Sequence, residues 1–410
     1  MDNDDRDGRA GGDEAWLNPG VRGIGTASLL SDAGHEIPTS LLPSFLTATL
    51  GAPASALGLI EGISDGLAGV ARLGGGALAE DPHRRRATAV GGYATTAVLS
   101  GLIGVATSVW QVGALRAGAW FSRGLRVPAR NALLADTVAA PFYGRAYGFE
   151  RAMDNLGAIL GPLLAIALVA AFSTRAAILI STIPGLLATL AIVYAIRHTR
   201  QPKERRRRPI RIRIRPVMNG ELGKLLGAIS VFEVGNVAAT LLILRATDLL
   251  EPGRSLDDAT QIAIGLYVLY NLMATLASVP AGRLADSSTP IRVLIIGTGA
   301  FAAAYGGFAF VGASIPLLAV FFILAGLGIG AVETAEHSAV AILAPESLRG
   351  SSFGALAAIQ SFGNLLSSSI VGVLYVAFSP TVAFLAPTVA MIVALAVFLS
   401  ILRTARSNAG

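Results

Sequence analysis

Long apolar runs, separated by short polar or charged clusters, make up most of this 410-residue chain. Each run has about 20 residues or more, the length that an α-helix needs to cross the hydrocarbon core of a bilayer. The pattern predicts two sets of helices. The first set is expected near residues 22–50, 56–80, 87–107, 111–135, 146–171 and 176–197. The second set is expected near residues 221–249, 260–285, 291–312, 316–341, 350–377 and 380–403.

The composition supports a membrane protein. Hydrophobic residues make up 53% of the chain and charged residues only 14%, against about 25% charged in soluble domains. The mean hydropathy is +0.63, and a soluble domain of this composition could not cover its own surface. We therefore predict an all-α polytopic membrane protein with twelve transmembrane helices in two pseudo-symmetric six-helix halves. The absence of cysteine excludes disulfides, thiolate metal sites and cysteine nucleophiles.

Charge clusters set the expected domain boundaries. Residues 1–20 start with an acidic stretch and lack the apolar core of a signal peptide, so we expect a disordered cytoplasmic tail. Residues 21–197 and 221–405 are expected to form the N-terminal and C-terminal six-helix bundles, and residues 406–410 a short tail. The linker 198–220 is dense in arginine and interrupted by proline. Beside a helix end, such a run indicates cytoplasmic retention and contact with anionic lipid heads rather than nucleic-acid binding.

Arginine is unevenly distributed between the two sets of loops, and this sets the expected orientation. The net charge is +6, and basic residues cluster on the side of the linker, at Arg84, Arg85, Arg86, Arg145, Arg292, Arg349, Arg403 and Arg406. The opposite loops carry little beyond Arg175 and Arg254. By the positive-inside rule we expect both termini in the cytoplasm, in a multi-pass protein of the cytoplasmic (inner) membrane.

Two local matches at one offset indicate an internal duplication. Gly76 and Gly282 stand 206 positions apart in two similar segments that each follow a predicted helix. The same offset relates Gly144, Tyr147 and Gly148 to Gly350, Phe353 and Gly354. Parallel six-helix halves, with a substrate site between them at the membrane midplane, are a known product of such duplication.

Two stretches at cytoplasmic helix ends resemble sequence signatures of major facilitator superfamily transporters. Residues 76–86 are similar to the loop signature G-x-x-x-D-R-x-G-R-R, with Glu80 in the acidic place. Here Asp81 replaces the usual arginine and His83 the usual glycine. Residues 116–136 resemble the fourth-helix signature of the same superfamily, keeping its first arginine, its proline–alanine pair and its L-L-A-D ending.

A third stretch, residues 157–162, resembles the fifth-helix G-x-x-x-G-P signature associated with antiporters. The resemblance covers residues 21–405. It implies a monomeric secondary active transporter without a cofactor, most similar to the proton-coupled exporters of drugs and metabolites and working by alternating access. It also implies a cytoplasmic gate at Gly76, Glu80, Arg84, Arg85, Asp136, Gly282 and Asp286, and an antiporter-type motif at Gly157, Gly161 and Pro162. The sequence has no Walker motif, so energy is expected from a gradient.

Ionisable residues inside the predicted helices are the main indication of activity. Each costs about 2.5–3.5 kcal/mol near the bilayer centre on insertion scales, so a chain that carries many is expected to use them. Helical geometry places several of these residues on shared faces. We expect proton coupling at Asp32, His35, Glu36, Glu61, Asp65 and Arg116, with Arg116 as a fixed counter-charge and His35 as a relay. A permanent structural ion pair is the alternative.

Polar side chains on several helix faces are expected to line a substrate cavity. They are Thr39, Asp154, Asn155, Glu233, Asn236, Tyr267, Tyr270, Asn271, Glu333, Glu336, His337, Gln360 and Asn364. Hydrogen bonds between helices, worth about 0.6 kcal/mol each, explain any one of them equally well. The expected partners are therefore protons, a small-molecule substrate and the lipid bilayer, without nucleic acid.

Other functions stay open. The patterns D-x-x-H-E at residues 32–36 and E-x-x-E-H at residues 333–337 suit a divalent metal or a cationic metabolite as substrate, although no resident metal site is expected. A non-transporting receptor or a lipid-binding membrane protein could keep the same fold. An enzyme is not expected, because each pattern lacks one histidine of a zinc protease motif and no other catalytic set can be assembled.

Overall fold

The computed structural model describes residues 16–199 and 210–407, and within these ranges the chain is helical, without a β-strand. Expectations for residues 1–15, 200–209 and 408–410, which belong to the two tails and the basic linker, lie outside the described residues. The described helices confirm the predicted fold class, with twelve membrane-spanning segments in two halves.

The first six segments lie within a few residues of their expected positions. They are α2 (Pro19–Ser44), α3 (Ala54–Ala79), α4 (Pro82–Leu102), α5 (Val109–Ala135), α6 (Tyr143–Ala171), and α7 (Thr174–Ile180) continued by α8 (Thr182–His198). Four short helices accompany them: η1 (Phe45–Thr49), η2 (Ile103–Val105), η3 (Ala140–Phe142) and α9 (Ile214–Val217).

The second six segments also follow the predicted order. They are α10 (Gly220–Gly235) with α11 (Ala239–Leu250), α12 (Leu256–Ser287), α13 (Pro290–Phe310), α14 (Ile315–Leu343), α15 (Arg349–Ala377) and α16 (Pro380–Ser407). The short helix η4 (Glu251–Gly253) follows α11.

Contacts divide the chain into two compact units. The N-terminal unit comprises Met1–Val217 and Ala344–Ala358, and the C-terminal unit comprises Met218–Leu343 and Ile359–Gly410. The first turns of α15 thus pack with the N-terminal helices, whereas the rest of α15 belongs to the C-terminal unit. The C-terminal bundle expected from the sequence, residues 221–405, includes the whole of α15. This boundary stays a prediction.

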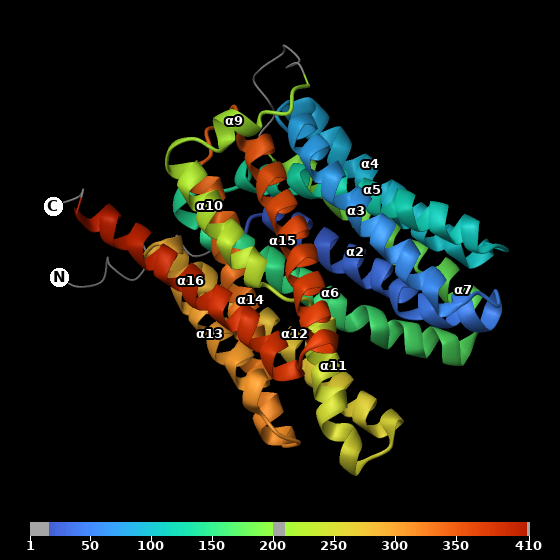
Figure 1. Cartoon of the computed structure of the whole chain (residues 1–410). Coiled ribbons are helices and arrows are strands. Elements are labelled where there is room, and N and C mark those ends of the chain that lie inside the picture. Colours follow the sequence, from blue (N-terminus) through green and yellow to red (C-terminus); the bar gives the residue numbers. More distant parts are fainter. Residues whose placement is uncertain (1–15, 200–209, 408–410) are drawn as a thin grey trace, which may run out of the picture. The chain divides into compact units, whose positions relative to one another are not determined.

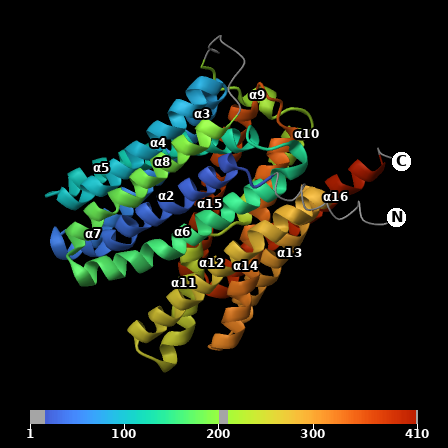
Figure 2. The same ribbon diagram turned by 180° about the vertical axis from the view of Figure 1, so that it is seen from behind.

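In the N-terminal unit, α2 packs against α6 and α8, and α5 packs against α3 and α4 (Figure 1). Seen from behind, α8 runs between α2 and α4 (Figure 2), and it packs on both. Local sequence sets where these helices begin. Asn18 caps α2 by accepting from Val21 N at 3.1 Å, with Pro19 in the first turn, and Asp81 and Ser108 cap α4 and α5.

The prediction of one continuous helix near residues 221–249 is wrong, because the helix is broken between α10, which ends at Gly235, and α11, which begins at Ala239. At the break, Val237 N donates to Tyr305 Oη at 3.2 Å and Ala238 N donates to Ser368 Oγ at 3.0 Å. Asn364 Nδ2 donates to Asn236 O at 3.2 Å. These side-chain partners replace helical hydrogen bonds, which allows an interrupted backbone at membrane depth.

Among the helices in the described ranges, nine spans are long and apolar enough to cross a membrane by length and composition. The three long helices outside that set are α2, α3 and α5. These helices carry all six ionisable residues for which the sequence predicts proton coupling, and this lowers their hydropathy. In the C-terminal unit, α14 packs against α12 and α13, and α16 packs against α13 and α10.

Glycine at position 157 sets the approach of α6 to α2. A Cβ built there would lie 2.6 Å from Leu29 O and 2.9 Å from Asp32 Cβ. We expect Gly157→Ala to push the two helices apart and to destabilise the protein by about 1–3 kcal/mol, the usual cost of overpacking. Thermal unfolding of purified protein in detergent measures this loss. Gly91→Ala on α4 is the matched control, because a Cβ there meets no atom within 4 Å, and equal melting temperatures for the two variants would contradict the prediction.

Candidate functional site

One charged cluster joins α2 to α5 and has a histidine at its centre. His35 Nδ1 lies 3.3 Å from Asp32 Oδ1, and His35 Nε2 lies 3.2 Å from Glu36 Oε1. Arg123 donates to Asp32 Oδ1 at 3.4 Å and also contacts His35 Nε2. Asp32 and His35 are buried, whereas the Glu36 side chain is 26% exposed. One imidazole therefore touches two acids and a guanidinium.

A second cluster lies beside the first, between α3 and α5. Arg116 Nη2 is 3.0 Å from Glu61 Oε1, and Arg116 Nη1 donates to Thr39 Oγ1 at 3.0 Å. The Arg116 guanidinium carbon stands 3.5 Å from the centre of the Trp120 ring, and Trp120 Nε1 donates to Asp65 Oδ1 at 2.7 Å. The negative face of the aromatic ring attracts the buried positive charge and stabilises it.

The two clusters are connected by Trp120. Its ring also meets the His35 ring edge-on at a centroid distance of 5.4 Å, and Arg123 lies 5.7 Å from its centre. Three of the six residues predicted for proton coupling, His35, Asp65 and Arg116, contact Trp120. The other three contact these residues: Asp32 and Glu36 lie on His35, and Glu61 lies on Arg116. Their roles stay a prediction. Arg123 and Trp120 are not among the residues predicted from the sequence, because the local pattern of α5 does not show which of its side chains reach α2.

A third cluster ties α5 to α6 with ion pairs. Glu150 is fully buried and receives Arg130 at 2.6 Å and Arg151 at 2.8 Å. Asp154, expected in the substrate cavity, lies 3.4 Å from Arg130 and 3.3 Å from Arg151. Ser28 Oγ of α2 donates to Glu150 at 2.6 Å. Two arginines thus balance two acids, which favours a structural part for Asp154.

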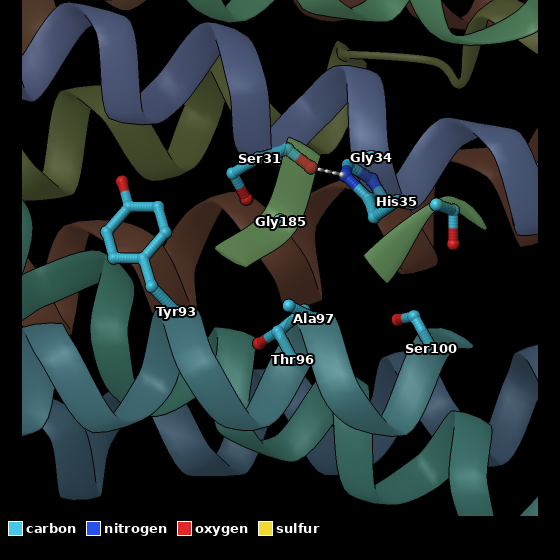
Figure 3. A pocket seen from close by; sticks show the side chains of 9 residues that line it. Ser31, Gly34, His35, Tyr93, Thr96, Ala97, Ser100 and Gly185 are labelled. Carbon is cyan, nitrogen blue, oxygen red and sulfur yellow. Dashed lines mark hydrogen bonds between the residues drawn. The ribbon is translucent and has the colours of Figure 1, made fainter. Parts of the chain in front are cut away.

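A small cavity adjoins the first cluster, between α2, α4 and α8. It is lined by Ser31, Gly34, His35, Tyr93, Thr96, Ala97, Ser100, Ser181 and Gly185 (Figure 3). It has room for about one water molecule. Among the described residues, neither the buried Tyr93 hydroxyl nor the buried Ser100 Oγ has a hydrogen-bond partner. Arg126, also buried, lies with its guanidinium 3.9 Å from the centre of the Tyr93 ring.

The predicted gate residues of the N-terminal unit meet the first turn of α15. Glu80 accepts from Ser351 Oγ, and Arg213 Nε lies 3.6 Å from its other oxygen. Asp136 pairs with Arg85 and, at 3.0 Å, with Arg349. These contacts belong to one compact unit.

Close backbone packing accompanies these ion pairs. A Cβ built on Gly76 would lie 2.8 Å from Gly350 O and 2.9 Å from Gly354 Cα. Gly161, of the predicted antiporter-type motif, lies close to Glu36 and Ala33 of α2, and Pro162 follows it inside α6. Two further predicted gate residues, Gly282 and Asp286, lie together in the last turns of α12, and Arg84 donates its backbone N–H to the Asp81 cap at 3.2 Å.

In the C-terminal unit, acids and amides meet beside the break between α10 and α11. Asn236 Nδ2 donates to Glu233 Oε2 at 3.0 Å, and Gln360 Nε2 donates to Glu336 Oε2 at 2.8 Å. Asn364 binds the backbone of the break. The structure therefore brings together five residues predicted for the substrate cavity, although that function stays a prediction.

The other predicted cavity residues mostly bond within their own helices. Tyr267 and Tyr270 stack at 5.8 Å, and Asn271 Nδ2 donates to Tyr267 O at 3.1 Å. His337 Nδ1 lies 2.7 Å from Glu333 O. Asn155 Nδ2 on α6 has no hydrogen-bond partner within residues 16–199 and 210–407. Within the described ranges, no group of three or more histidine, aspartate or glutamate residues could hold a metal ion.

Comparison with known families settles the wider relationship. The family model described as Major Facilitator Superfamily matches residues 24–245 and 216–410, which together cover most of the chain. The chain belongs to the major facilitator superfamily. This MFS protein is therefore a membrane transporter rather than an enzyme, and its fold is that of secondary transport. The resemblance inferred from residues 76–86, 116–136 and 157–162 is confirmed at the level of the family.

One relative is similar along nearly its whole length. An uncharacterised MFS-type transporter of Methanocaldococcus jannaschii is 26% identical over 381 residues, which cover 92% of this chain and 93% of the relative. Among solved structures, a bacterial homologue of the iron transporter ferroportin has a TM-score of 0.75 at 16% identity, covering 93% of this chain and 98% of that one. The human organic anion transporter MFSD10 has a TM-score of 0.72 at 14% identity, covering 93% and 99%. At these identities the structures show the shared fold alone.

Asp136 holds the first turn of α15 to the N-terminal helices through two arginines. Each charge-assisted hydrogen bond is worth about 1.5–3 kcal/mol, and partial exposure places Asp136 at the lower end of that range. We expect Asp136→Asn to increase the population in which α15 is detached from α4. Spin labels at the exposed positions Ala87 and Ser347 report this as longer distances in double electron–electron resonance. Glu221→Gln, at an exposed acid, is the control. An unchanged distance distribution in Asp136→Asn would show that this pairing does not hold the contact.

Proposed function

We propose that this MFS transporter is a proton-coupled exporter that exchanges protons for a small organic molecule by alternating access. The observation that carries the proposal is the buried contact of His35 with Asp32, Glu36 and Arg123. A histidine changes charge near neutral pH, and a change of charge inside a buried cluster must alter its partners.

The chemistry of His35 Nε2 supports this coupling. Arg123 only donates hydrogen bonds, whereas the Glu36 carboxylate only accepts them. A neutral ring with its lone pair on Nε2 accepts from Arg123. A protonated ring repels Arg123 and donates to Glu36. Binding of one proton therefore changes the hydrogen-bond partner of Nε2 from Arg123 to Glu36. Because the arginine is on α5 and both acids are on α2, this exchange changes the force between two helices.

Export is supported by sequence rather than by geometry. The Gly157–Pro162 motif resembles that of antiporters, and its glycines allow α6 to approach α2 at the coupling cluster. We place both termini in the cytoplasm and the protein in the cytoplasmic membrane, as the arginine distribution favours. In this orientation the contact of Glu80 and Asp136 with α15 is the cytoplasmic gate, and one chain is the transporting unit.

A cationic metabolite is the second candidate substrate. Glu233, Glu333 and Glu336 lie near one another in the C-terminal unit, and Tyr267 and Tyr270 offer stacked aromatic faces that suit a cation. The lack of a metal-holding group in the described residues does not support the divalent-metal version. Binding of organic cations, but not of neutral or anionic analogues, in a thermal-shift screen would favour this candidate.

Neutral replacements in α2 test the coupling. We expect Asp32→Asn and Glu36→Gln to keep substrate exchange, because both side chains keep nearly the same shape. Gradient-driven accumulation in proteoliposomes should fall by about tenfold or more, which corresponds to about 1.4 kcal/mol of driving force that is no longer drawn from the gradient. The substrate is first identified by thermal-shift screening of the purified protein.

The control for that experiment is Ser44→Ala, at an exposed position of the same helix. Accumulation equal to wild type in both acid variants would remove α2 from the coupling mechanism, and Glu61 and Asp65 would become the candidates. Loss of substrate binding as well as accumulation would identify the two acids as substrate ligands instead.

The orientation can be tested directly because the chain has no cysteine of its own. We expect Ser287→Cys to react with a membrane-impermeant maleimide only in inverted vesicles. Gly253→Cys, where an added Cβ meets no atom within 4 Å, should react only in intact cells. Labelling of Ser287→Cys from outside intact cells would overturn the proposed orientation.

A further inference from the structure

Two fully buried glutamates in this protein are neutralised in different ways. Glu150 in the N-terminal unit receives hydrogen bonds from Arg151 and forms an ion pair with Arg130 at 2.6 Å. Glu336 in the C-terminal unit is equally buried, at 0% exposed, and its nearest charged neighbours are acids. Acids cannot neutralise a negative charge on Glu336 as the two arginines neutralise that on Glu150.

Only one of the two carboxyl oxygens of Glu336 accepts a hydrogen bond from a described residue. Oε2 accepts from Gln360 Nε2 at 2.8 Å. Oε1 is buried and has no hydrogen-bond partner among the residues that the structure describes. An ionised carboxylate spreads its charge over both oxygens and would leave one of them without any donor, which is strongly unfavourable away from water.

The helices packed around α14 place acids and neutral groups near Glu336. Glu233 on α10 and Glu333 on α14 act on Glu336 with like charge. Gln360 on α15 bonds Glu336 directly, whereas Tyr270 on α12 lies near Glu333 and Tyr305 on α13 lies near Glu233; all three are neutral groups. His337 on α14 is the nearest basic residue in sequence, and α14 contains neither arginine nor lysine.

We propose that Glu336 is a proton-binding site of the C-terminal unit and carries a proton in this conformation. Burying an unpaired carboxylate costs so much that the group binds a proton instead. The neutral acid keeps the Gln360 hydrogen bond on its carbonyl oxygen. The proton removes the like-charge repulsion from Glu233 and Glu333.

A proton fits this site better than a metal ion or a bound substrate. Glu336 is fully buried, so a molecule in a cavity cannot reach its carboxyl group without a rearrangement. Within the described part of the chain, Glu336 and its acidic neighbours do not form a group of three or more residues that could hold a metal ion. A proton needs only one unpaired oxygen and no coordination shell.

The site gives the proposed transport cycle a second proton. This step rests on the proposed proton coupling, whereas protonation of Glu336 does not. The broken backbone between α10 and α11 lies beside Glu233, one of the acids that act on Glu336. Movement at this break would change the surroundings of the proton and allow it to leave.

Two measurements on the full-length protein test the site without a substrate. Infrared spectra of purified protein should contain a carbonyl band of a neutral carboxylic acid that is missing in Glu336→Gln. Gln360→Leu should shift this band to higher frequency, because the carbonyl loses its donor. Transfer to D2O should shift it within minutes, as required of a proton that exchanges. Glu150→Gln should leave the band unchanged, since Glu150 is ionised in its arginine pairs.

The melting temperatures of Glu336→Gln and Glu150→Gln provide a second, independent test. Glu336→Gln replaces one neutral group by another and should keep the melting temperature within the error of the measurement. Glu150→Gln removes the negative charge that pairs with Arg130 and Arg151, so it should clearly lower the melting temperature. A band that persists in Glu336→Gln would overturn the proposal, and so would a band that does not respond to D2O. If the band behaves as expected but transport ignores the pH gradient, the proton site stands and the proposed function fails.

Discussion

A charge buried among membrane helices has to be neutralised, and this constraint organises the N-terminal unit. Removing one partner of a buried pair costs about 3–5 kcal/mol, because the remaining charge stays uncompensated. Arg116 pairs with Glu61, Arg123 with Asp32, and Arg130 with Glu150. All three arginines come from α5, which therefore acts as the positively charged element against which acids of α2, α3 and α6 are placed.

Close helix packing makes this arrangement possible. Gly124 on α5 faces α3, where an added Cβ would lie 2.8 Å from Ala71 Cβ, and Gly157 lets α6 approach α2 near Asp32. Long charged side chains then span short distances and keep their hydrogen bonds away from lipid. The ion pairs thus depend on the small residues. A distance of about 3 Å between charged groups requires closely packed helix backbones, and a side chain larger than glycine would push these backbones apart.

The sequence was sufficient for the helices and the family, because apolar runs of bilayer length and local signatures are properties of nearby residues. It also placed Asp32, His35 and Glu36 on one face correctly. It could not find the partnership of Arg123 with His35, since 88 positions separate them and only packing decides which arginine reaches the cluster. The break at 236–238 was missed because its stability comes from distant hydroxyls of Tyr305 and Ser368, not from a local proline. The internal repeat relates Tyr147 to Phe353, but it does not show that these equivalent residues touch, as their rings do at a centroid distance of 5.7 Å.

The two units solve the same electrostatic problem with different means, and the difference bears on how a transporter moves. In the N-terminal unit the compensating charges are side chains, so any rearrangement must exchange one ion-pair partner for another, as His35 Nε2 can do between Arg123 and Glu36. In the C-terminal unit the proposed compensating charge on Glu336 is a proton, which can leave once movement at the break between α10 and α11 changes its surroundings. A pair of fixed charges resists motion until a new partner is in reach, whereas a released proton changes the balance at once. Proton loss in the C-terminal unit would therefore destabilise one conformation directly, and partner exchange in the N-terminal unit would select the conformation that follows.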